Sequence, residues 1–251
     1  MTDLKKENLN KLHNIMLDIL TEVDKICIKH NIEYWLDSGT LLGAVRHKGF
    51  IPWDDDLDIS MTLEDYYRFL NIVQEELPSH MKLQTAEIEK GFPYDFAKIR
   101  DSRGTLIEKH EIGKTISYNQ GVFIDIIPVI KIDSSLYSKY KYKFLFSLIQ
   151  LFSYNYLNLK LIRNLLINQN DKSNKKSNSI MIRSGKFPSS LCYVDTKSVF
   201  PLVKIEFNGK SFFSPKNAHT YLLRLYGKDY MVLPPVEQRH THADTIEIYE
   251  E

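Results

Sequence analysis

Four aspartates within five positions constrain this chain more than any other feature of its sequence. They lie just before an apolar stretch and are Asp54, Asp55, Asp56 and Asp58. Like charges at this density repel one another, and a folded protein tolerates them mainly where divalent cations neutralise them. Residues 57–61 alternate as a strand does, so side chains two positions apart share a face. We therefore expect Asp56 and Asp58 to point the same way, with Asp54 joining them from the preceding loop.

This spacing predicts a metal site formed by Asp54, Asp56 and Asp58. Carboxylate oxygens are the ligands that Mg²⁺ prefers, usually one or two from the protein with water and phosphate completing the shell. Oxygen ligands suit Mn²⁺ equally well, so the choice between Mg²⁺ and Mn²⁺ stays open. The alternative is a solvated acidic turn. Such turns rarely lie between a tryptophan, here Trp53, and a strand of buried character.

A small-residue turn precedes the aspartates. Residues 32–36 are typical of a short strand, Ser38, Gly39 and Thr40 of a tight turn, and the following residues of a helix. A helix N-terminus after such a turn favours anions, because free backbone N–H groups and the helix dipole attract negative charge. Gly39 lets the backbone approach a phosphate closely, and the two hydroxyls add donors. We predict that this turn binds phosphate.

The run from Trp35 to Met61 resembles the signature of the LicD family, which is part of the nucleotidyltransferase-fold superfamily and is related to the fukutin-related proteins. Residues 96–101, 122–128 and 226–235 fit the same family in order, so the match covers most of the chain. The first block is specific, and the later blocks are supportive. Two departures stand out: Gly39 is followed by threonine where the superfamily commonly has Gly-Ser or Gly-Gly, and residues 131–190 align with nothing in the pattern.

The resemblance implies a metal-dependent transferase. Members move a phosphorylated alcohol, such as phosphocholine or a polyol phosphate, from a CDP-activated donor to a glycan hydroxyl. The donor diphosphate would lie across residues 38–40 and the ions held by Asp56 and Asp58, which neutralise charge developing on the attacking and leaving oxygens. The superfamily has a third carboxylate on a neighbouring strand. Asp125, a lone acid in an apolar strand, is the candidate, either as a catalytic metal ligand or as the general base for the acceptor hydroxyl. The alternative is a buried structural acid paired with a lysine or arginine.

Four basic residues are candidates for binding the donor. Arg46 and His47 follow the phosphate-binding turn and either hold the nucleotide or offset the aspartates. Lys98 and Arg100 share one face of a strand expected over residues 95–100. Two cations projecting together suit a diphosphate, which an arginine can bind in bidentate fashion. Surface strands carry such pairs routinely, and that remains the alternative.

Phosphocholine is the first expectation for the transferred group, because a quaternary ammonium suits an aromatic cage. Aromatic candidates for such a cage are Tyr34, Trp53, Tyr94 and Tyr118. A ribitol or glycerol phosphate would need hydroxyl-binding side chains instead. Candidates for that role are Ser117, Asn119 and Gln120. Two further alternatives stay open: a true nucleotidyltransferase, which would use the same metals and turn, and a non-catalytic protein that only holds a nucleotide or glycan.

The sequence predicts an α/β (α+β) fold, which the resemblance specifies as a nucleotidyltransferase-like mixed sheet with flanking helices. The first 30 residues suit an amphipathic helix, and Thr62 can cap a second helix. Strands are expected near residues 81–84, 95–100, 105–108 and 122–127. We divide the chain into a catalytic core, 1–130, and a second part, 131–251, packed on it. That part is predicted to hold a basic helical segment, a mobile loop over 168–190, and a C-terminal hairpin and helix, the hairpin turning at Asn208-Gly209.

The charge of the chain is unevenly distributed. A formal net charge of +1 argues against nucleic acid as a partner. Residues 131–186 nevertheless hold eleven Lys or Arg and two Asp, a local charge of +9. Residues 137–168 are also aromatic and leucine-rich, which makes them a candidate for peripheral membrane contact, as a lipid-linked glycan acceptor would require. The alternative is a helical lid that buries its own apolar face.

Three further expectations concern the location of the protein, its cysteines and its C-terminal basic residues. No signal peptide or uncharged membrane span is recognisable, so we expect a cytoplasmic protein, with the inner face of the membrane as a candidate location. Cys27 and Cys192 are expected to be buried thiols. Arg239, His240 and His242 are expected to face solvent or a phosphate rather than to bind a metal.

Overall fold

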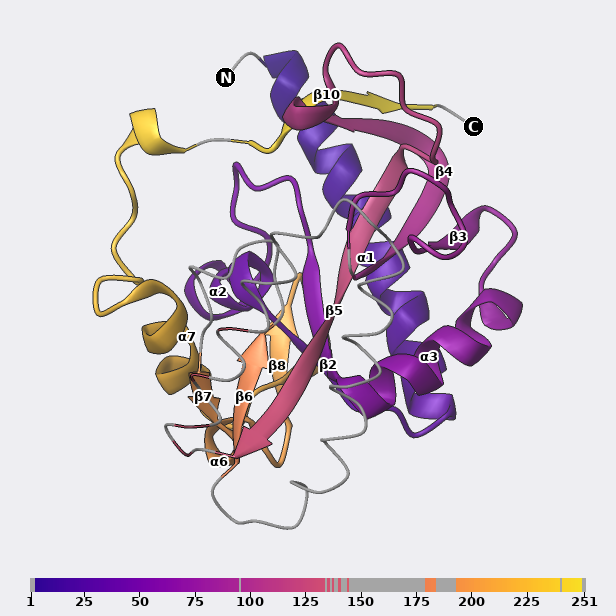
Figure 1. Cartoon of the computed structure of the whole chain (residues 1–251). Helices are drawn as coiled ribbons and strands as arrows, with labels where there is room; N and C mark the ends of the chain where they lie inside the picture. Colours follow the sequence, from indigo (N-terminus) through magenta and orange to yellow (C-terminus); the bar gives the residue numbers. More distant parts are fainter. Residues whose placement is uncertain are drawn as a thin grey trace.

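The computed structural model describes residues 3–94, 96–133, 135, 137, 140, 144, 179–183, 193–239 and 241–249. Its elements in chain order (Figure 1) are α1 (Asp3–Lys29), β1 (Tyr34–Leu36), α2 (Ser38–His47), β2 (Asp58–Thr62), α3 (Leu63–Glu76), β3 (Met81–Gln84), β4 (Ala97–Glu108), η1 (Lys109–Glu111), β5 (Gly121–Asp133), β6 (Ser179–Arg183), β7 (Tyr193–Asp195), α6 (Thr196–Val199), β8 (Val203–Phe207), β9 (Lys210–Ser214), α7 (Ala218–Tyr226), η3 (Val236–Gln238) and β10 (Ala243–Ile248). Most of the predicted helical segment and loop at 137–168 and 168–190 therefore lies outside the described residues, as do Cys192 and His240.

One mixed sheet of eight strands positions the site. Strands β1, β2, β5, β4 and β10 follow in that order, β3 adds to β4, and β6 joins β5 to β7. Strands β2 and β5 run parallel, and the other pairs described are antiparallel. The register sets Asp58 beside Asp125 across β2–β5, and Lys98 beside Asp125 across β4–β5. Paired residues share a face, so these three side chains form one row. The α/β fold with a mixed sheet and flanking helices is confirmed.

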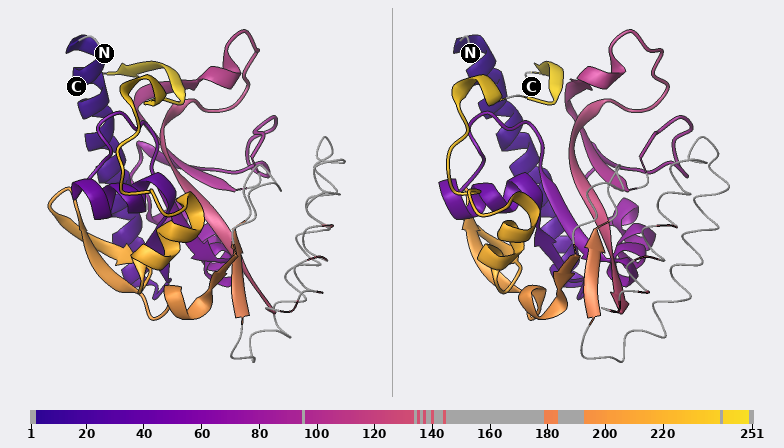
Figure 2. Two further views of the ribbon diagram at one scale, coloured as in Figure 1. Left: turned by 90° about the vertical axis from the view of Figure 1, so that its left-hand side faces the viewer. Right: turned by 60° about the vertical axis from the view of Figure 1, so that its left-hand side comes forward.

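Helix α1 supports the sheet from one face. Its apolar residues recur at helical spacing, and Leu12, Met16, Ile19 and Val23 are fully buried. The helix packs against β4, β5 and β10, and Figure 2 shows it running along the sheet. The amphipathic helix expected in the first 30 residues is confirmed.

Local sequence signals set the ends of several elements as predicted. The Thr62 side chain accepts a hydrogen bond from the Asp65 N–H and caps α3. Asn208 and Gly209 have positive φ angles of 49° and 73° between β8 and β9, as a type I′ hairpin turn requires. Gly227 is the C-terminal cap of α7.

Other elements differ from the expectation. Residues 97–108 form one continuous strand, because an irregularity between Asp101 and Thr105 absorbs the turn-like residues in a single ladder. A boundary at residue 130 falls inside β5, and β6, β7 and β10 extend the same sheet. Strand β10, which pairs with the second half of β4, is not indicated by the sequence pattern. Among the described residues, we find no helix with the length and apolar character needed to cross a bilayer.

Candidate active site

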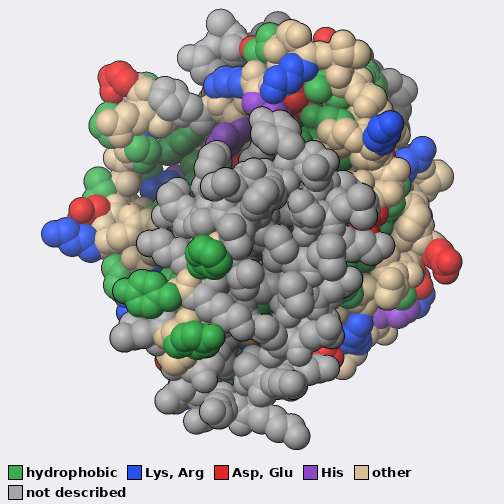
Figure 3. All heavy atoms as spheres, in the orientation of Figure 1, with side chains coloured by type: hydrophobic (Ala, Val, Ile, Leu, Met, Phe, Trp, Pro, Cys, Tyr) green, Lys and Arg blue, Asp and Glu red, His purple; other side chains and the backbone are tan. Residues whose placement is uncertain are grey.

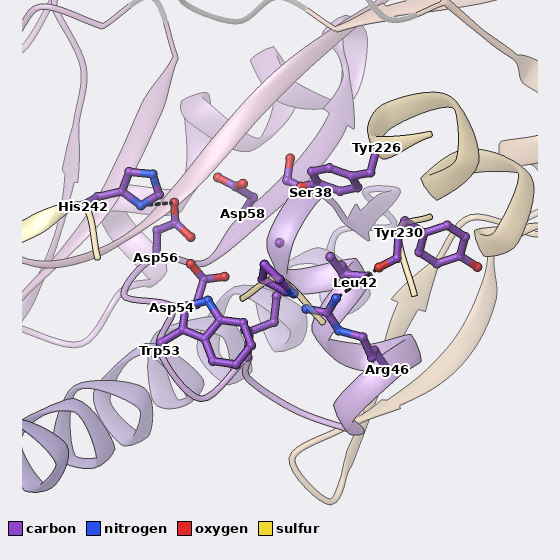
Figure 4. Close-up of a pocket in the computed structure, with 13 residues that line it drawn as sticks. Ser38, Leu42, Arg46, Trp53, Asp54, Asp56, Asp58, Tyr226, Tyr230 and His242 are labelled. Carbon is purple, nitrogen blue, oxygen red and sulfur yellow. Dashed lines mark hydrogen bonds and ion pairs between the residues drawn. The ribbon is translucent and has the colours of Figure 1, made fainter. Parts of the chain in front are cut away.

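A cavity of about 470 Å³ opens between the start of α2, the aspartate loop and the segment after α7. Its lining residues are Ser38, Gly39, Leu42, Arg46, Ile51, Trp53, Asp54, Asp56, Asp58, Tyr226, Tyr230, Pro234 and His242. The space-filling view shows the hollow between the projecting C-terminal segment and the body of the molecule (Figure 3). The close-up shows the carboxylates of Asp54, Asp56 and Asp58 directed toward this space (Figure 4). The structure therefore brings together the three aspartates that the spacing predicts.

The N-terminus of α2 forms the floor beside these carboxylates. Ser38, Gly39 and Thr40 are the first helical turn, rather than a turn before the helix, with Asp37 as the N-cap. The Ser38 hydroxyl is buried without a hydrogen-bond partner and belongs to the cavity lining. The Thr40 hydroxyl instead accepts the Asp58 N–H at 2.8 Å, so it positions β2 and does not line the cavity.

Gly39 is required by the close approach of the aspartate loop. A Cβ atom at this position would lie 2.7 Å from Asp54 Oδ2 and 3.9 Å from Asp56 Oδ1. Real Cβ atoms do not tolerate the shorter distance, so the absence of a side chain lets the carboxylate reach the positive end of the helix. From the sequence we explained Gly39 by the need for the backbone to come close to a phosphate. The structure adds a second reason, because the Asp54 carboxylate also comes close to this residue.

The carboxylates of the cavity repel one another. Burial, together with the charges of Asp58 and Asp55, raises the pKa of Asp54 to about 6. Burial and the Asp54 charge raise the pKa of Asp56 well above its ordinary value. A cation placed among these oxygens would relieve both effects. The donor set consists of carboxylate oxygens and therefore fits Mg²⁺ or Mn²⁺.

Asp55 has a different role from its neighbours. Its buried carboxylate accepts the backbone N–H groups of His242 at 2.8 Å and Ala243 at 2.5 Å. Although burial acts in the opposite direction, these bonds and the His242 side chain hold the pKa of Asp55 below its ordinary value. Asp55 thus fastens the start of β10 to the aspartate loop.

The sequence interpretation expected His242 to face solvent or a phosphate and did not place it with the aspartates, but the residue lines the cavity beside them. Its side chain is 67 % exposed, and its Nδ1 lies 3.4 Å from Asp55 Oδ1 and 3.5 Å from Asp56 Oδ2. The hydrogen bond to Asp55 and the surrounding carboxylates raise its pKa to about 9 against the effect of burial. Ligand atoms of Asp54, Asp55 and His242 lie within 4.8 Å of one another. No local signal links a histidine to an acid 187 positions away.

Asp125 lies beside Asp58 in the parallel ladder, as a third carboxylate requires. Its Oδ1 is also 3.0 Å from Lys98 Nζ, and Glu108 Oε2 is 3.6 Å from the same ammonium. Burial raises the pKa of Asp125, and the Lys98 charge opposes that rise. The ion pair with Lys98 is expected if Asp125 is a buried structural acid. Its position beside Asp58 in the β2–β5 ladder is expected if Asp125 is a catalytic carboxylate. Asp125 is not part of the cavity lining.

Lys98 and Arg100 do not reach the cavity. Each side chain is 1 % exposed, and both lie against the ring of Phe123. The Arg100 guanidinium donates to Gln84 Oε1 at 2.7 Å and to the Gly121 carbonyl at 2.6 Å. The two residues share a face as predicted, but that face is covered in the folded chain. The geometry therefore gives no support to their binding a diphosphate.

Arg46 lies at the end of the cavity away from the aspartates (Figure 4). Its guanidinium donates to the Tyr230 carbonyl at 3.1 Å, which ties α2 to the segment after α7. Arg239 stacks on Trp53, with its guanidinium carbon 4.4 Å from the ring centre. Burial lowers the pKa of Arg46, and the Arg239 charge acts in the same direction. His47 contacts the Trp53 ring edge and is not among the lining residues.

The aromatic cage expected for a quaternary ammonium is not assembled from the predicted residues. Tyr34 is fully buried, and its hydroxyl donates to Asp24. The rings of Tyr94 and Trp53 already contact cations of the chain, from Lys98 and Arg239 respectively. Of the four predicted aromatic residues, Trp53 alone lines the cavity, together with two tyrosines of the C-terminal segment that were not proposed for the cage, Tyr226 and Tyr230.

Comparisons with known proteins show the family to which the chain belongs. Residues 31–152 match the family described as LicD/FKTN/FKRP, nucleotidyltransferase domain. The chain is 31 % identical, over 263 aligned positions, to the lipopolysaccharide cholinephosphotransferase LicD of Haemophilus influenzae, and the alignment covers 95 % of this chain and 97 % of that enzyme. It is 48 % identical over 58 residues to an uncharacterized protein of Rickettsia typhi, which covers 23 % of this chain and 19 % of that protein. A 34-residue stretch is 56 % identical to mouse ribitol 5-phosphate transferase FKRP, covering 14 % of this chain and 7 % of that enzyme.

Proposed function

Because this chain belongs to the LicD family, we propose that it transfers a phospho-alcohol from a CDP-activated donor to a hydroxyl of a glycan, with Mg²⁺ or Mn²⁺ as cofactor. The observation that carries the proposal is the convergence of Asp54, Asp56 and Asp58 on one cavity at the start of α2. Carboxylates that raise one another's pKa need a cation, and a helix N-terminus beside them suits a phosphate.

The chain's own residues have distinct parts in this reaction. Asp54, Asp56 and Asp58 would hold the metal, which when bound neutralises charge on the phosphate oxygens. The first turn of α2 and the free Ser38 hydroxyl would bind the donor diphosphate. Arg46, at the far end of the cavity, would bind the remaining negative charge of the nucleotide.

Asp125 would serve beside Asp58, either as a metal ligand or as the base that takes the acceptor's proton. The Lys98 ammonium at 3.0 Å favours its ionised form, which both roles need. Burial acts in the opposite direction and raises the pKa of Asp125, an effect that a neighbouring cation would oppose.

Phosphocholine is the first choice for the transferred group. The supporting relative is a cholinephosphotransferase that aligns over 95 % of this chain. A polyol phosphate such as ribitol or glycerol phosphate is the second choice, because the match to a ribitol 5-phosphate transferase spans only 34 residues. Of the four aromatic residues that the sequence proposed for a choline cage, only Trp53 lines the cavity, so the predicted cage adds little support for choline and none for a polyol.

The acceptor would be a surface glycan, built in the cytoplasm on a lipid carrier at the inner face of the membrane. The name of the full-length relative, which acts on lipopolysaccharide, supports a glycan joined to lipid. We also propose, from the sequence composition alone, that residues 137–168 contact the membrane.

Donor hydrolysis and transfer can be tested directly by mass spectrometry. The protein is incubated with CDP-choline, CDP-ribitol, CDP-glycerol or nucleoside triphosphates, with Mg²⁺ or with EDTA. Metal-dependent release of CMP from one CDP-alcohol supports the proposal and identifies the donor. Pyrophosphate released from a triphosphate would instead indicate nucleotidyl transfer, and nucleotide binding without turnover would indicate a binding protein.

Variants connect that activity to the carboxylates. We expect Asp56→Asn and Asp58→Asn each to abolish turnover while the fold, followed by circular dichroism, is kept. Asp18→Asn is the matched control, because its side chain is 52 % exposed on α1 and pairs only with Arg103 among the described contacts. Near-native turnover in Asp58→Asn would refute the metal assignment.

A further inference from the structure

The aspartate loop is held from outside by two distant elements. Residues 48–54 connect α2 to the carboxylates and carry Asp54 at their end. His13, on α1, places Nε2 2.7 Å from the Asp54 carbonyl oxygen. A carbonyl can only accept, so Nε2 donates. His13 is a buried polar residue within the apolar stripe of α1, where a hydrocarbon side chain would fill the space but could not donate.

The same histidine also fixes the loop through ring contacts. Its imidazole stacks on Phe50 with 4.1 Å between ring centres and an interplanar angle of 3°. Phe50 in turn meets the edge of Phe207, on β8, at 4.8 Å. Flat stacking restricts the orientation of both rings, so the carbonyl donor and the loop are oriented together.

The turn between β8 and β9 forms hydrogen bonds with the other end of this loop. Asn208 Oδ1 accepts the Phe50 N–H at 3.2 Å, and the Asn208 N–H donates to the Lys48 carbonyl at 2.8 Å. Gly49 faces this turn, and a Cβ there would lie 1.9 Å from Asn208 Oδ1. The turn and the loop are thus in direct contact, with no space for a side chain between them.

These contacts bear on the carboxylate because Asp54 lies close against the first turn of α2. Its Oδ2 is 2.7 Å from the position that a Gly39 Cβ would occupy, so a shift of the loop would change how closely the carboxylate approaches the helix N-terminus. Main-chain anchors at Lys48, Phe50 and Asp54 set the placement of the loop. Small displacements of a metal ligand lower affinity, and residues that orient ligands matter nearly as much as the ligands themselves.

We propose that His13 and Asn208 are positioning residues of the carboxylate site, which fix Asp54 through the backbone of its loop. The proposal rests on the metal assignment made above. Both residues lie outside the matched family segment, residues 31–152. The site geometry therefore depends on α1 and on the β8–β9 hairpin, parts of the chain that contribute no ligand.

The test measures Mn²⁺ binding directly, by the electron paramagnetic resonance signal of the free ion. His13→Phe keeps a flat ring against Phe50 but removes the donor, and His13→Gln restores a donor without the ring. We expect about 10- to 100-fold weaker binding in His13→Phe and partial recovery in His13→Gln. Asn208→Gly keeps the turn, since glycine adopts positive φ freely, and loses only the side-chain acceptor. We expect a smaller loss there, of several-fold.

The control separates positioning from loss of stability. Val23→Ala removes buried volume from the same helix about 15 Å further along, and it should lower the melting temperature without changing Mn²⁺ affinity. Wild-type affinity in His13→Phe and Asn208→Gly would overturn the proposal, as would an equal loss in Val23→Ala. If His13→Phe does not fold, the Mn²⁺ affinity of Asn208→Gly alone tests the proposal. Wild-type protein that fails to bind Mn²⁺, or Asp58→Asn that binds it normally, would refute the metal assignment itself and the proposal with it.

Discussion

Replacing Lys98 with methionine separates two interpretations of a buried lysine. The side chain is 1 % exposed, its Nζ is 3.0 Å from Asp125 and 3.6 Å from Glu108, and it lies 3.2 Å from the ring centre of Phe123. Methionine fills similar volume but leaves two carboxylates without their cation. Breaking a buried pair by removing one partner costs about 3–5 kcal/mol. For a chain of this size that lowers the melting temperature by about 6–20 °C.

Lys204 is a matched control for this change. It pairs with Asp24 at 3.4 Å and lies 3.6 Å from the ring centre of Phe213, but its side chain is 39 % exposed. An exposed pair contributes at most about 1 kcal/mol, so Lys204→Met should shift the melting temperature by no more than about 4 °C. Differential scanning calorimetry measures both variants. Removing the Asp125 charge as well, with Asp125→Asn, should recover part of the loss.

One result would refute this reasoning. If Lys98→Met melts within about 2 °C of the wild type while the KM for the CDP-alcohol rises, the ammonium contacts the donor. The sequence-based assignment of Lys98 to the diphosphate would then be right, and the buried ion pair would not describe the protein in solution.

Two further predictions concern the site and its surroundings. Gly39→Ala places a Cβ 2.7 Å from Asp54 Oδ2, so we expect weaker Mn²⁺ binding and slower turnover with little loss of helix. Gly113→Ala is its control away from the site: its φ of +73° strains the backbone, but nothing lies within 4 Å of the added Cβ, so an equal loss of Mn²⁺ binding in both variants would contradict the steric argument. Hydrogen bonds from Tyr118, Gln120 and the Glu108 N–H hold the pKa of Glu111 below its ordinary value despite burial. The unfolded chain therefore binds this proton first, and the stability due to Glu111 is lost as pH falls through its folded-state pKa. The melting-temperature difference between wild type and Glu111→Gln, measured by differential scanning fluorimetry, should narrow as the pH falls from about 5 to about 3, and a constant difference would refute the role of ionisation.

Features that depend on neighbouring residues could be predicted from the sequence. The Thr62 cap, the Asn208-Gly209 turn and the stripe of α1 each depend on spacing within one element, and each is confirmed. The alternation of side chains along a strand also predicted that Lys98 and Arg100 share a face of the sheet. Alternation does not reveal whether that face is exposed to solvent, because burial depends on what packs over it. Both side chains are buried.

Features that depend on distant segments could not be predicted. His242 reaches the cavity because Asp55 binds the backbone at the start of β10, across 187 positions of sequence. His13 reaches the loop because α1 packs across the sheet. Sequence spacing links neither histidine to the aspartates, since a lone histidine has the same sequence signature in a core, on a surface or in a site.

The aspartate cluster shows how far a local argument extends. Alternation puts Asp54, Asp56 and Asp58 on one side and Asp55 on the other, although β2 begins only at Asp58. The structure has this division: three carboxylates line the cavity, and Asp55 accepts two backbone N–H groups. Hydrogen bonds stabilise the negative charge of Asp55, and the proposed cation would stabilise that of the three carboxylates in the cavity. Under this proposal the four neighbouring acids are tolerated because they face two different partners, and only the cavity side would need a metal.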